Sequence, residues 1–77
     1  MESVIAILKQ IRPEFEFSGV DDFFASGMLD SFDLTTLISA LEERYGIVLD
    51  GEDIVPENFC NVEAIVRLMA KYRVAMM

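Results

Sequence analysis

The sequence predicts a single all-α domain. Apolar residues recur at helical spacing in three segments, and each segment has residues at its ends that commonly start or stop a helix. Little of the chain alternates between apolar and polar residues, as strands do. Hydrophobic residues make up 53% of the 77 residues, which favours a folded core over disorder. We therefore expect residues 1–77 to form one four-helix bundle, with three longer helices and one short third helix.

The first helix is expected from about Ser3 to Ile11. Pro13 ends it, because a proline biases the residue before it away from helical geometry. The apolar face consists of Val4, Ile5, Leu8 and Ile11. A long connection then leads to Asp30, and its aromatic residues predict that it lies across the bundle and contributes to the core, with one helical turn near residues 20–25.

The second helix is the clearest element of the sequence. It runs from Ser31 to Tyr45, and Gly46 is placed to terminate it. Its apolar stripe consists of Leu34, Leu37, Ile38, Leu41 and Tyr45. With Leu34 at the centre of that stripe, helical geometry places on the opposite, exposed side Phe32, Thr36, Ser39 and Glu43.

Two further helices are expected towards the carboxyl end. Pro56 suits the first position of a very short third helix, which ends near Phe59. Asn61 then caps the last helix. The buried stripe of that helix consists of Val62, Ile65, Val66, Met69 and Tyr72.

Acidic residues dominate the middle of the chain. The sequence has 14 acidic and 6 basic side chains, a net charge of −8, and Arg44 is the one basic residue between Glu14 and Glu63. Such a surface repels nucleic acid and anionic membranes, and it speeds encounter with partners that carry basic patches. Solubility alone is the other explanation of this acidity.

The composition argues against an enzyme. The chain has no histidine and one cysteine, Cys60, which removes Cys–His and Ser–His nucleophile pairs and the common zinc sites. The acidic turn at residues 50–53 lacks the ligand spacing of an EF-hand, so no metal site is predicted. A basic leader, a membrane-length apolar run and paired cysteines are all missing from the sequence, and we expect a cytoplasmic protein.

The start of the second helix is the informative site. The first amides of a helix lack partners and the helix dipole is positive there, so an attached phosphate is favoured electrostatically. If Asp30 is the N-cap, Asp33 completes a shortened capping box, and Ser31 becomes the first helical residue with a free hydroxyl. If Ser31 is itself the N-cap, its hydroxyl only accepts an amide hydrogen bond. The neighbouring Phe32 offers a partner an apolar anchor.

Three stretches of the chain resemble the acyl carrier proteins: Gly27-Met28-Leu29-Asp30-Ser31-Phe32-Asp33, Leu41-Glu42-Glu43 and Ile54-Val55-Pro56-Glu57. The resemblance covers nearly the whole chain and implies a four-helix bundle of the acyl-carrier type with a long first loop. It further implies that Ser31 carries 4'-phosphopantetheine, donated by coenzyme A through a phosphopantetheinyl transferase, and that Asp30 helps engage this transferase. The thiol of the arm would then hold acyl groups as thioesters for delivery to other enzymes.

The same resemblance implies a recognition surface centred on the second helix. Basic patches of partner enzymes would dock at the acidic positions Asp33, Glu42 and Glu43, for which solvated helix surface is the other possible role. The expected recognition residues are Phe32, Asp33, Thr36, Ser39, Glu42, Glu43 and Ile54. The expected partners are the transferase, an acyl-loading ligase or acyltransferase, and downstream synthase enzymes. We expect a monomeric carrier that neither binds nucleic acid nor inserts into membranes.

Three residues depart from the family pattern. Phe32 replaces the usual leucine, Thr36 stands where an acidic residue is frequent, and Ser39 occupies a position that is often apolar. We expect the cargo to belong to fatty-acid, polyketide or related biosynthesis. The departures favour a specialised carrier, for polyketide, modified-lipid or amino-acyl chemistry, over the general fatty-acid carrier. Two alternatives stay open: an amino-acyl carrier of the D-alanyl or peptidyl kind, and an acidic helical adaptor that binds a basic protein without covalent modification.

Overall fold

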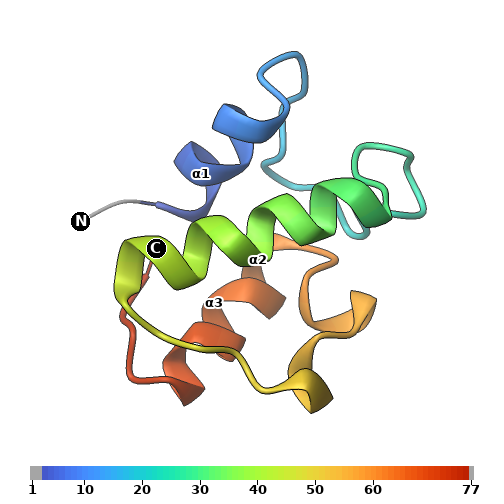
Figure 1. Ribbon diagram of the computed structural model, residues 1–77. Coiled ribbons are helices and arrows are strands. Elements are labelled where there is room, and N and C mark those ends of the chain that lie inside the picture. The colour runs from blue at the N-terminus through green and yellow to red at the C-terminus, as the bar shows by residue number, and fades with distance from the viewer. Residues whose placement is uncertain (1–2, 77) are drawn as a thin grey trace.

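A computed structural model describes residues 3–76 of the chain. It contains three α-helices, α1 (Val4–Ile11), α2 (Ser31–Tyr45) and α3 (Val62–Lys71), and two 3-10 helices, η1 (Gly51–Asp53) and η2 (Pro56–Asn58). In Figure 1, α2 crosses the molecule with α1 above it and α3 below it. No strand occurs within residues 3–76, so the predicted all-α class is confirmed.

The predicted count of four helices is not confirmed. The segment that was expected to form a short third helix forms only the 3-10 helix η2, with Pro56 at its first position as predicted. No side chain caps its amino end, and Phe59, directly after it, is fully buried in the core. A segment drawn into the core after three residues has no room to add an α-helical turn.

Local hydrogen bonds fix where the three α-helices begin and end. Ser3, Asp30 and Asn61 are their N-caps, and each side chain accepts the amide three residues further on. Gly46 ends α2 in the left-handed conformation with φ 62°, which a glycine adopts without steric cost. The predicted bounds of α1 and α2 and the predicted start of α3 are therefore confirmed to within one residue.

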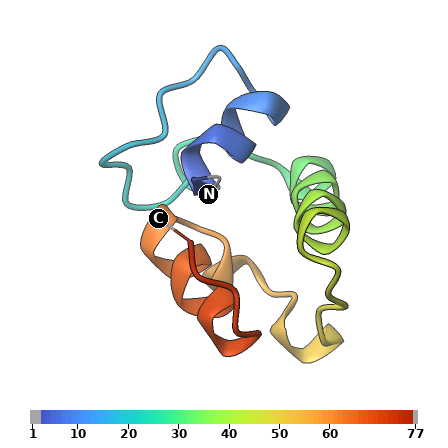
Figure 2. The ribbon, with the colours of Figure 1, turned by 90° about the vertical axis from the view of Figure 1, so that its left-hand side faces the viewer.

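The core lies between α2 on one side of the molecule and α1 and α3 on the other, which Figure 2 shows in a view along α2. Helix α1 contributes Val4, Ile7 and Leu8, so Ile7 takes the buried place that was expected for Ile5. In α2 the buried stripe is centred on Leu37 and Leu41, and the predicted centre, Leu34, is only partly buried. Helix α3 contributes Ala64, Ile65, Leu68 and Met69.

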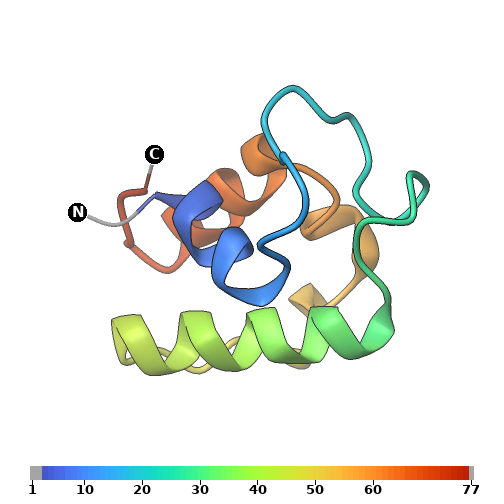
Figure 3. The same cartoon turned by 90° about the horizontal axis from the view of Figure 1, so that it is seen from above.

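The long connection between α1 and α2 forms part of this core, as predicted, and Figure 3 shows it arching over one end of the bundle. Phe17 and Phe23 are fully buried and meet edge to face with ring centroids 5.2 Å apart. The Phe23 amide donates to the Cys60 carbonyl at 2.6 Å, which ties the loop to the chain ahead of α3. The turn expected near residues 20–25 begins at Asp22, whose carboxylate accepts two amides of the turn, and no α-helix forms.

The 3-10 segment is fastened to the end of α3 by a polar cluster. Asp53 accepts hydrogen bonds from Lys71 at 2.8 and 2.9 Å and from the Tyr72 hydroxyl at 2.5 Å. These hydrogen bonds from Lys71 and Tyr72 lower the pKa of Asp53 below its ordinary value. Within residues 3–76, no helix is both long and apolar enough to cross a lipid bilayer.

We predict that Phe17→Ala removes most of the stability of the fold. Truncating a buried phenylalanine costs about 3–5 kcal/mol, and a domain of this size has a net stability of roughly the same magnitude. Phe32→Ala is the matched control, because this ring is 77% exposed, and its stability should change by no more than about 0.5 kcal/mol. Urea unfolding followed by circular dichroism measures both variants. Equal midpoints for the two variants would contradict the assigned core.

Candidate functional site

A tight turn directs the chain into the start of α2. Gly27 adopts φ 78°, a left-handed conformation that side chains other than glycine rarely take. The amides of Met28 and Leu29 both donate to the Phe23 carbonyl, at 2.9 and 3.2 Å. Leu29 is buried, so the chain is anchored in the core immediately before Asp30. The position of the helix start is therefore fixed by the loop that precedes it.

Asp30 and Asp33 form a reciprocal capping box at this helix start. The Asp33 amide donates to Asp30 Oδ1 at 2.9 Å, and the Asp30 amide donates to Asp33 Oδ2 at 3.2 Å. Asp30 is therefore the N-cap, and the alternative in which Ser31 takes this role is wrong. Asp33, whose side chain is shorter than the glutamate usual at this position, completes the box, as predicted for the case in which Asp30 is the N-cap.

Ser31 is the first residue of α2 and is exposed. Among residues 3–76, no hydrogen bond engages its hydroxyl, and none engages the amides of Ser31 and Phe32. Unpaired amides at the positive end of a helix dipole favour an anion. The site thus combines an accessible hydroxyl with backbone donors suited to a phosphate.

Arg12 holds the inner member of the capping box from the end of α1. Its Nε and Nη2 atoms lie 3.0 and 2.9 Å from Asp33 Oδ2, and Nη2 lies 3.8 Å from Asp30 Oδ2. Asp33 is only 5% exposed. Burial by itself raises the pKa of Asp33, but the Arg12 hydrogen bond and charge, together with the Asp30 amide, outweigh it, and the pKa lies below its ordinary value. Asp33 is therefore a buried carboxylate that stays charged.

The structure brings four of the predicted recognition residues to one exposed face of α2: Phe32, Thr36, Ser39 and Glu43. Phe32 is 77% exposed, and of the large hydrophobic side chains only Val48 is also exposed in the described part of the chain. The Thr36 hydroxyl donates to the Phe32 carbonyl at 3.2 Å, so it is turned back on the helix. This face presents an aromatic ring near Ser31 and a carboxylate further along.

Three other predicted recognition residues are placed differently. Asp33 is buried against Arg12, which leaves its carboxylate no access to a partner. Glu42 is half-buried, and its Oε2 accepts the Leu49 amide at 2.9 Å. Ile54 is also half-buried and packs against the core. The two carboxylates were expected at the docking surface, but they are used inside the fold.

Arg12 was not among the site residues predicted from the sequence. Its partner Asp33 lies 21 positions away, and no local spacing links the two residues. One indirect signal was available. In a capping box the carboxylate at N3, here Asp33, turns back towards the N-cap, and a basic residue, Arg12, lies at the end of α1 directly before Pro13.

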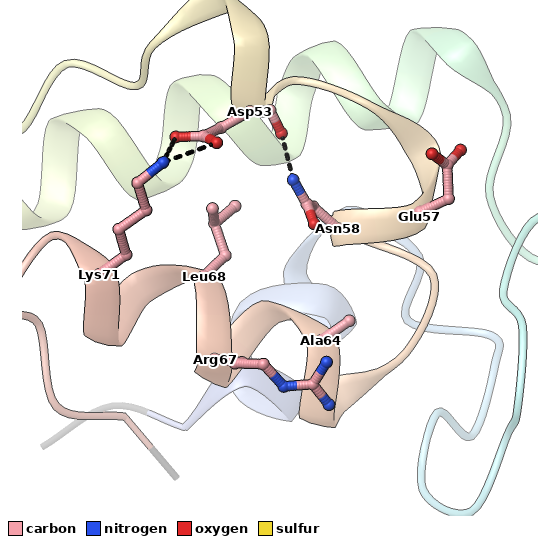
Figure 4. A pocket seen from close by; sticks show the side chains of 7 residues that line it. All are labelled: Asp53, Glu57, Asn58, Ala64, Arg67, Leu68 and Lys71. Atoms are coloured by element: carbon pink, nitrogen blue, oxygen red, sulfur yellow. Dashed lines mark hydrogen bonds and ion pairs between the residues drawn. The ribbon is translucent and has the colours of Figure 1, made fainter.

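Other polar clusters lie in the 3-10 segment and at α3, outside this site. A cavity of about 310 Å³ lies between the 3-10 segment and α3, and Figure 4 shows Asp53 inside it joined to Lys71 and, through its backbone carbonyl, to Asn58. Asp50, in the acidic turn, caps η1 by accepting the Glu52 amide at 3.0 Å. Within residues 3–76, no group of three or more histidine, cysteine, aspartate or glutamate side chains is arranged to hold a metal.

Comparison with known proteins identifies the class of this domain. The family described as "Phosphopantetheine attachment site" matches residues 4–69, so the chain belongs to that family. An acyl carrier protein of Nitratidesulfovibrio vulgaris (strain DSM 19637 / Miyazaki F) is 40% identical over 53 residues, which cover 69% of this chain and 62% of that protein. The matched stretch thus spans less than two thirds of that relative. No solved structure matches the chain at a significant level.

These matches confirm two predictions from the sequence. The resemblance to the acyl carrier proteins is confirmed, and so is 4'-phosphopantetheine as the cofactor of this family. Members of the acyl carrier family are carriers and not enzymes.

We predict that Asp33→Asn destabilises the protein at neutral pH by about 1–3 kcal/mol, since a buried charged hydrogen bond is lost. The folded pKa of Asp33 is lowered, so its contribution is present above the unfolded value of about 3.9 and is lost as the pH falls through the folded pKa. The difference between wild type and variant should therefore shrink below about pH 4.

Urea titrations at pH 7, 5, 4 and 3 measure this difference, with Asp21→Asn in the exposed loop as control. A gap between wild type and Asp33→Asn that keeps its size down to the most acid point would contradict the assigned charge of Asp33.

Proposed function

We propose that the Ser31 hydroxyl is the attachment point of 4'-phosphopantetheine and that the chain carries acyl intermediates as thioesters on this arm. The observation that supports the assignment is the geometry of one residue. Ser31 is exposed, its hydroxyl has no hydrogen bond within residues 3–76, and it lies inside the stretch that matches the phosphopantetheine attachment family. The thiol at the end of the arm supplies the thioester chemistry.

The residues around Ser31 fit an attached phosphodiester. The amides of Ser31 and Phe32 have no partner in the described chain and can donate to phosphate oxygens. The Ser31 oxygen forms a bond to the pantetheine-bearing phosphorus of coenzyme A while the pyrophosphate bond breaks. Adenosine 3',5'-bisphosphate leaves with the bridging oxygen, and the proton of Ser31 passes to a base of the transferase. Asp30, whose side chain is 63% exposed, stands beside this serine and is available to engage the transferase.

Partner enzymes dock, in this proposal, on the exposed face of α2. Phe32 inserts into an apolar pocket of the partner, and Glu43 attracts its basic patch. Thr36 and Ser39 lie between them, and their small, uncharged side chains narrow the set of partners compared with a face that is acidic throughout. Ile54 borders the core and contributes through its exposed part.

The cargo belongs to fatty-acid, polyketide or related biosynthesis, and an acyl-loading ligase or acyltransferase supplies it. The departures at Phe32, Thr36 and Ser39 favour a specialised carrier. The match to the attachment family supports a covalently modified carrier over an unmodified acidic adaptor, and an amino-acyl cargo of the D-alanyl or peptidyl kind is the alternative within this class. We propose a monomeric, single-domain cytoplasmic protein in which η2 stands for the short third helix of the family.

We predict that the wild-type chain gains the mass of one phosphopantetheine group on incubation with coenzyme A, magnesium and a broad-specificity phosphopantetheinyl transferase. Ser31→Ala should keep the helical circular dichroism spectrum and gain no mass, because it lacks the acceptor oxygen. Ser26→Ala is the control and should be modified fully. The Ser26 hydroxyl donates to the Phe23 carbonyl at 3.2 Å and is therefore committed to the turn. A Ser31→Ala protein that still gains the group would refute the proposed site.

We predict that Glu43→Lys lowers the association rate with a basic partner, such as the transferase, by about threefold to tenfold at low salt, because charge complementarity steers the encounter. Its stability should hardly change, since Glu43 is exposed. Asp21→Lys makes the same charge change in the long loop and should have a smaller effect. Stopped-flow association at two salt concentrations measures the rates. Equal slowing by both substitutions would show that net charge, and not the α2 face, guides docking.

A further inference from the structure

Arg12 links the end of α1 to the turn that carries Ser31. Pro13 disfavours helical geometry at Arg12, which is the C-cap of α1. The backbone of Arg12 is non-helical, with φ −134° and ψ 81°. In this conformation the guanidinium reaches Asp33 Oδ2 through both Nε and Nη2. The same oxygen accepts the Asp30 amide at 3.2 Å. One buried oxygen therefore receives donors from two segments that are far apart in the sequence.

The first turn of α2 has few other tertiary anchors. Leu29 is buried just before the helix, and the next fully buried apolar side chain in α2 is Leu37, two turns further on. Between them Ser31 and Phe32 are exposed, and Leu34 is only partly buried. Helix ends fray when their groups lack partners. The part-buried ion pair of Arg12 and Asp33 therefore adds to the partial packing of Leu34 in holding this turn against the rest of the protein.

Loss of Arg12 would leave Asp33 without its counter-charge in the interior. A buried carboxylate without a partner is strongly unfavourable, so it leaves the interior or takes up a proton. Movement of Asp33 breaks its hydrogen bond with the Asp30 amide and opens the capping box. Ser31 lies between the two members of that box, so the backbone that carries its hydroxyl is then no longer held in one conformation.

Arg12 also balances charge where the phosphate arrives. Asp30 and Asp33 place two carboxylates next to Ser31, and a phosphodiester adds another negative charge. The guanidinium lies 3.8 Å from Asp30 Oδ2 and 2.9 Å from Asp33 Oδ2, so it offsets part of this repulsion.

We propose that Arg12 is a positioning residue for the modification of Ser31: through its ion pair with Asp33 it holds the first turn of α2 in the conformation that the transferase acts on. This inference rests on the proposed function of Ser31. It adds to that function a residue of α1 that lies outside both the serine motif and the docking face of α2.

The test compares transferase kinetics of Arg12→Met with those of the wild-type chain, using coenzyme A and magnesium. We expect kcat/KM to fall by roughly tenfold or more, because a misdirected acceptor atom slows group transfer. The loss should lie in kcat, and KM for the carrier should stay within about twofold, because the docking face is unchanged. Hydrogen exchange should speed up at the amides of Asp33 and Leu34 and stay unchanged around Leu41.

Three further variants separate positioning from folding. Arg12→Lys keeps one positive charge and should recover part of kcat. The double variant Arg12→Met/Asp33→Asn removes the unpaired charge and should lose less than the two single effects combined. Lys9→Met, in the last turn of α1, breaks the exposed ion pair of Lys9 with Glu16 in the long connection and should behave as wild type.

The outcomes distinguish this inference from the proposed function. A wild-type chain that is never modified would end both. A wild-type chain that is modified, with Arg12→Met modified at the same kcat and with unchanged exchange at Asp33, would overturn the role of Arg12 and leave Ser31 as the site. A loss of activity in Arg12→Met that follows only its unfolded fraction, and that Arg12→Lys does not relieve, would also overturn it.

Discussion

A single buried carboxylate organises the functional end of this protein. Asp33 accepts hydrogen bonds from Arg12 at the end of α1 and from the amide of Asp30 at the start of α2. Because a charge in the interior needs a partner, these contacts hold the end of α1 against the start of α2. The exposed hydroxyl of Ser31 lies within the same turn. We therefore propose that this contact, together with the loop that precedes α2, stabilises the helix start and presents the serine.

The two long connections of the fold contain little regular structure, but side-chain contacts hold both of them in place. Phe17 and Phe23, which lie in the long connection, fill the core at the end of the bundle where α2 begins. On the other side, Asp53 joins the 3-10 segment to Lys71 and Tyr72 at the end of α3. Both loops are thus held by specific contacts, and α2 can leave one face free of tertiary packing. This face carries Phe32 and Glu43 and is the surface on which we propose that partner enzymes dock.

The sequence was informative where structure depends on near neighbours along the chain. Asn61 was predicted as a cap, and Asp30 as one of two candidates, because such a side chain bonds an amide only three residues away. Gly46 was predicted to end α2 because left-handed geometry is local. The buried role of Asp33 was not foreseen, since its partner Arg12 is distant in the sequence and an aspartate on a helix is usually solvated. The segment at Pro56 was expected to be a helix, but the burial of Phe59 ends it after one 3-10 turn.

The central claim of this account is that the prosthetic arm is joined to the chain through the hydroxyl of Ser31. Fragmentation mass spectrometry of the wild-type protein, purified after modification by a phosphopantetheinyl transferase, locates the group directly without any substitution. We expect the fragment ions to assign the whole added mass to Ser31. Assignment of the group to any other residue would contradict the account, however well the protein serves as a carrier.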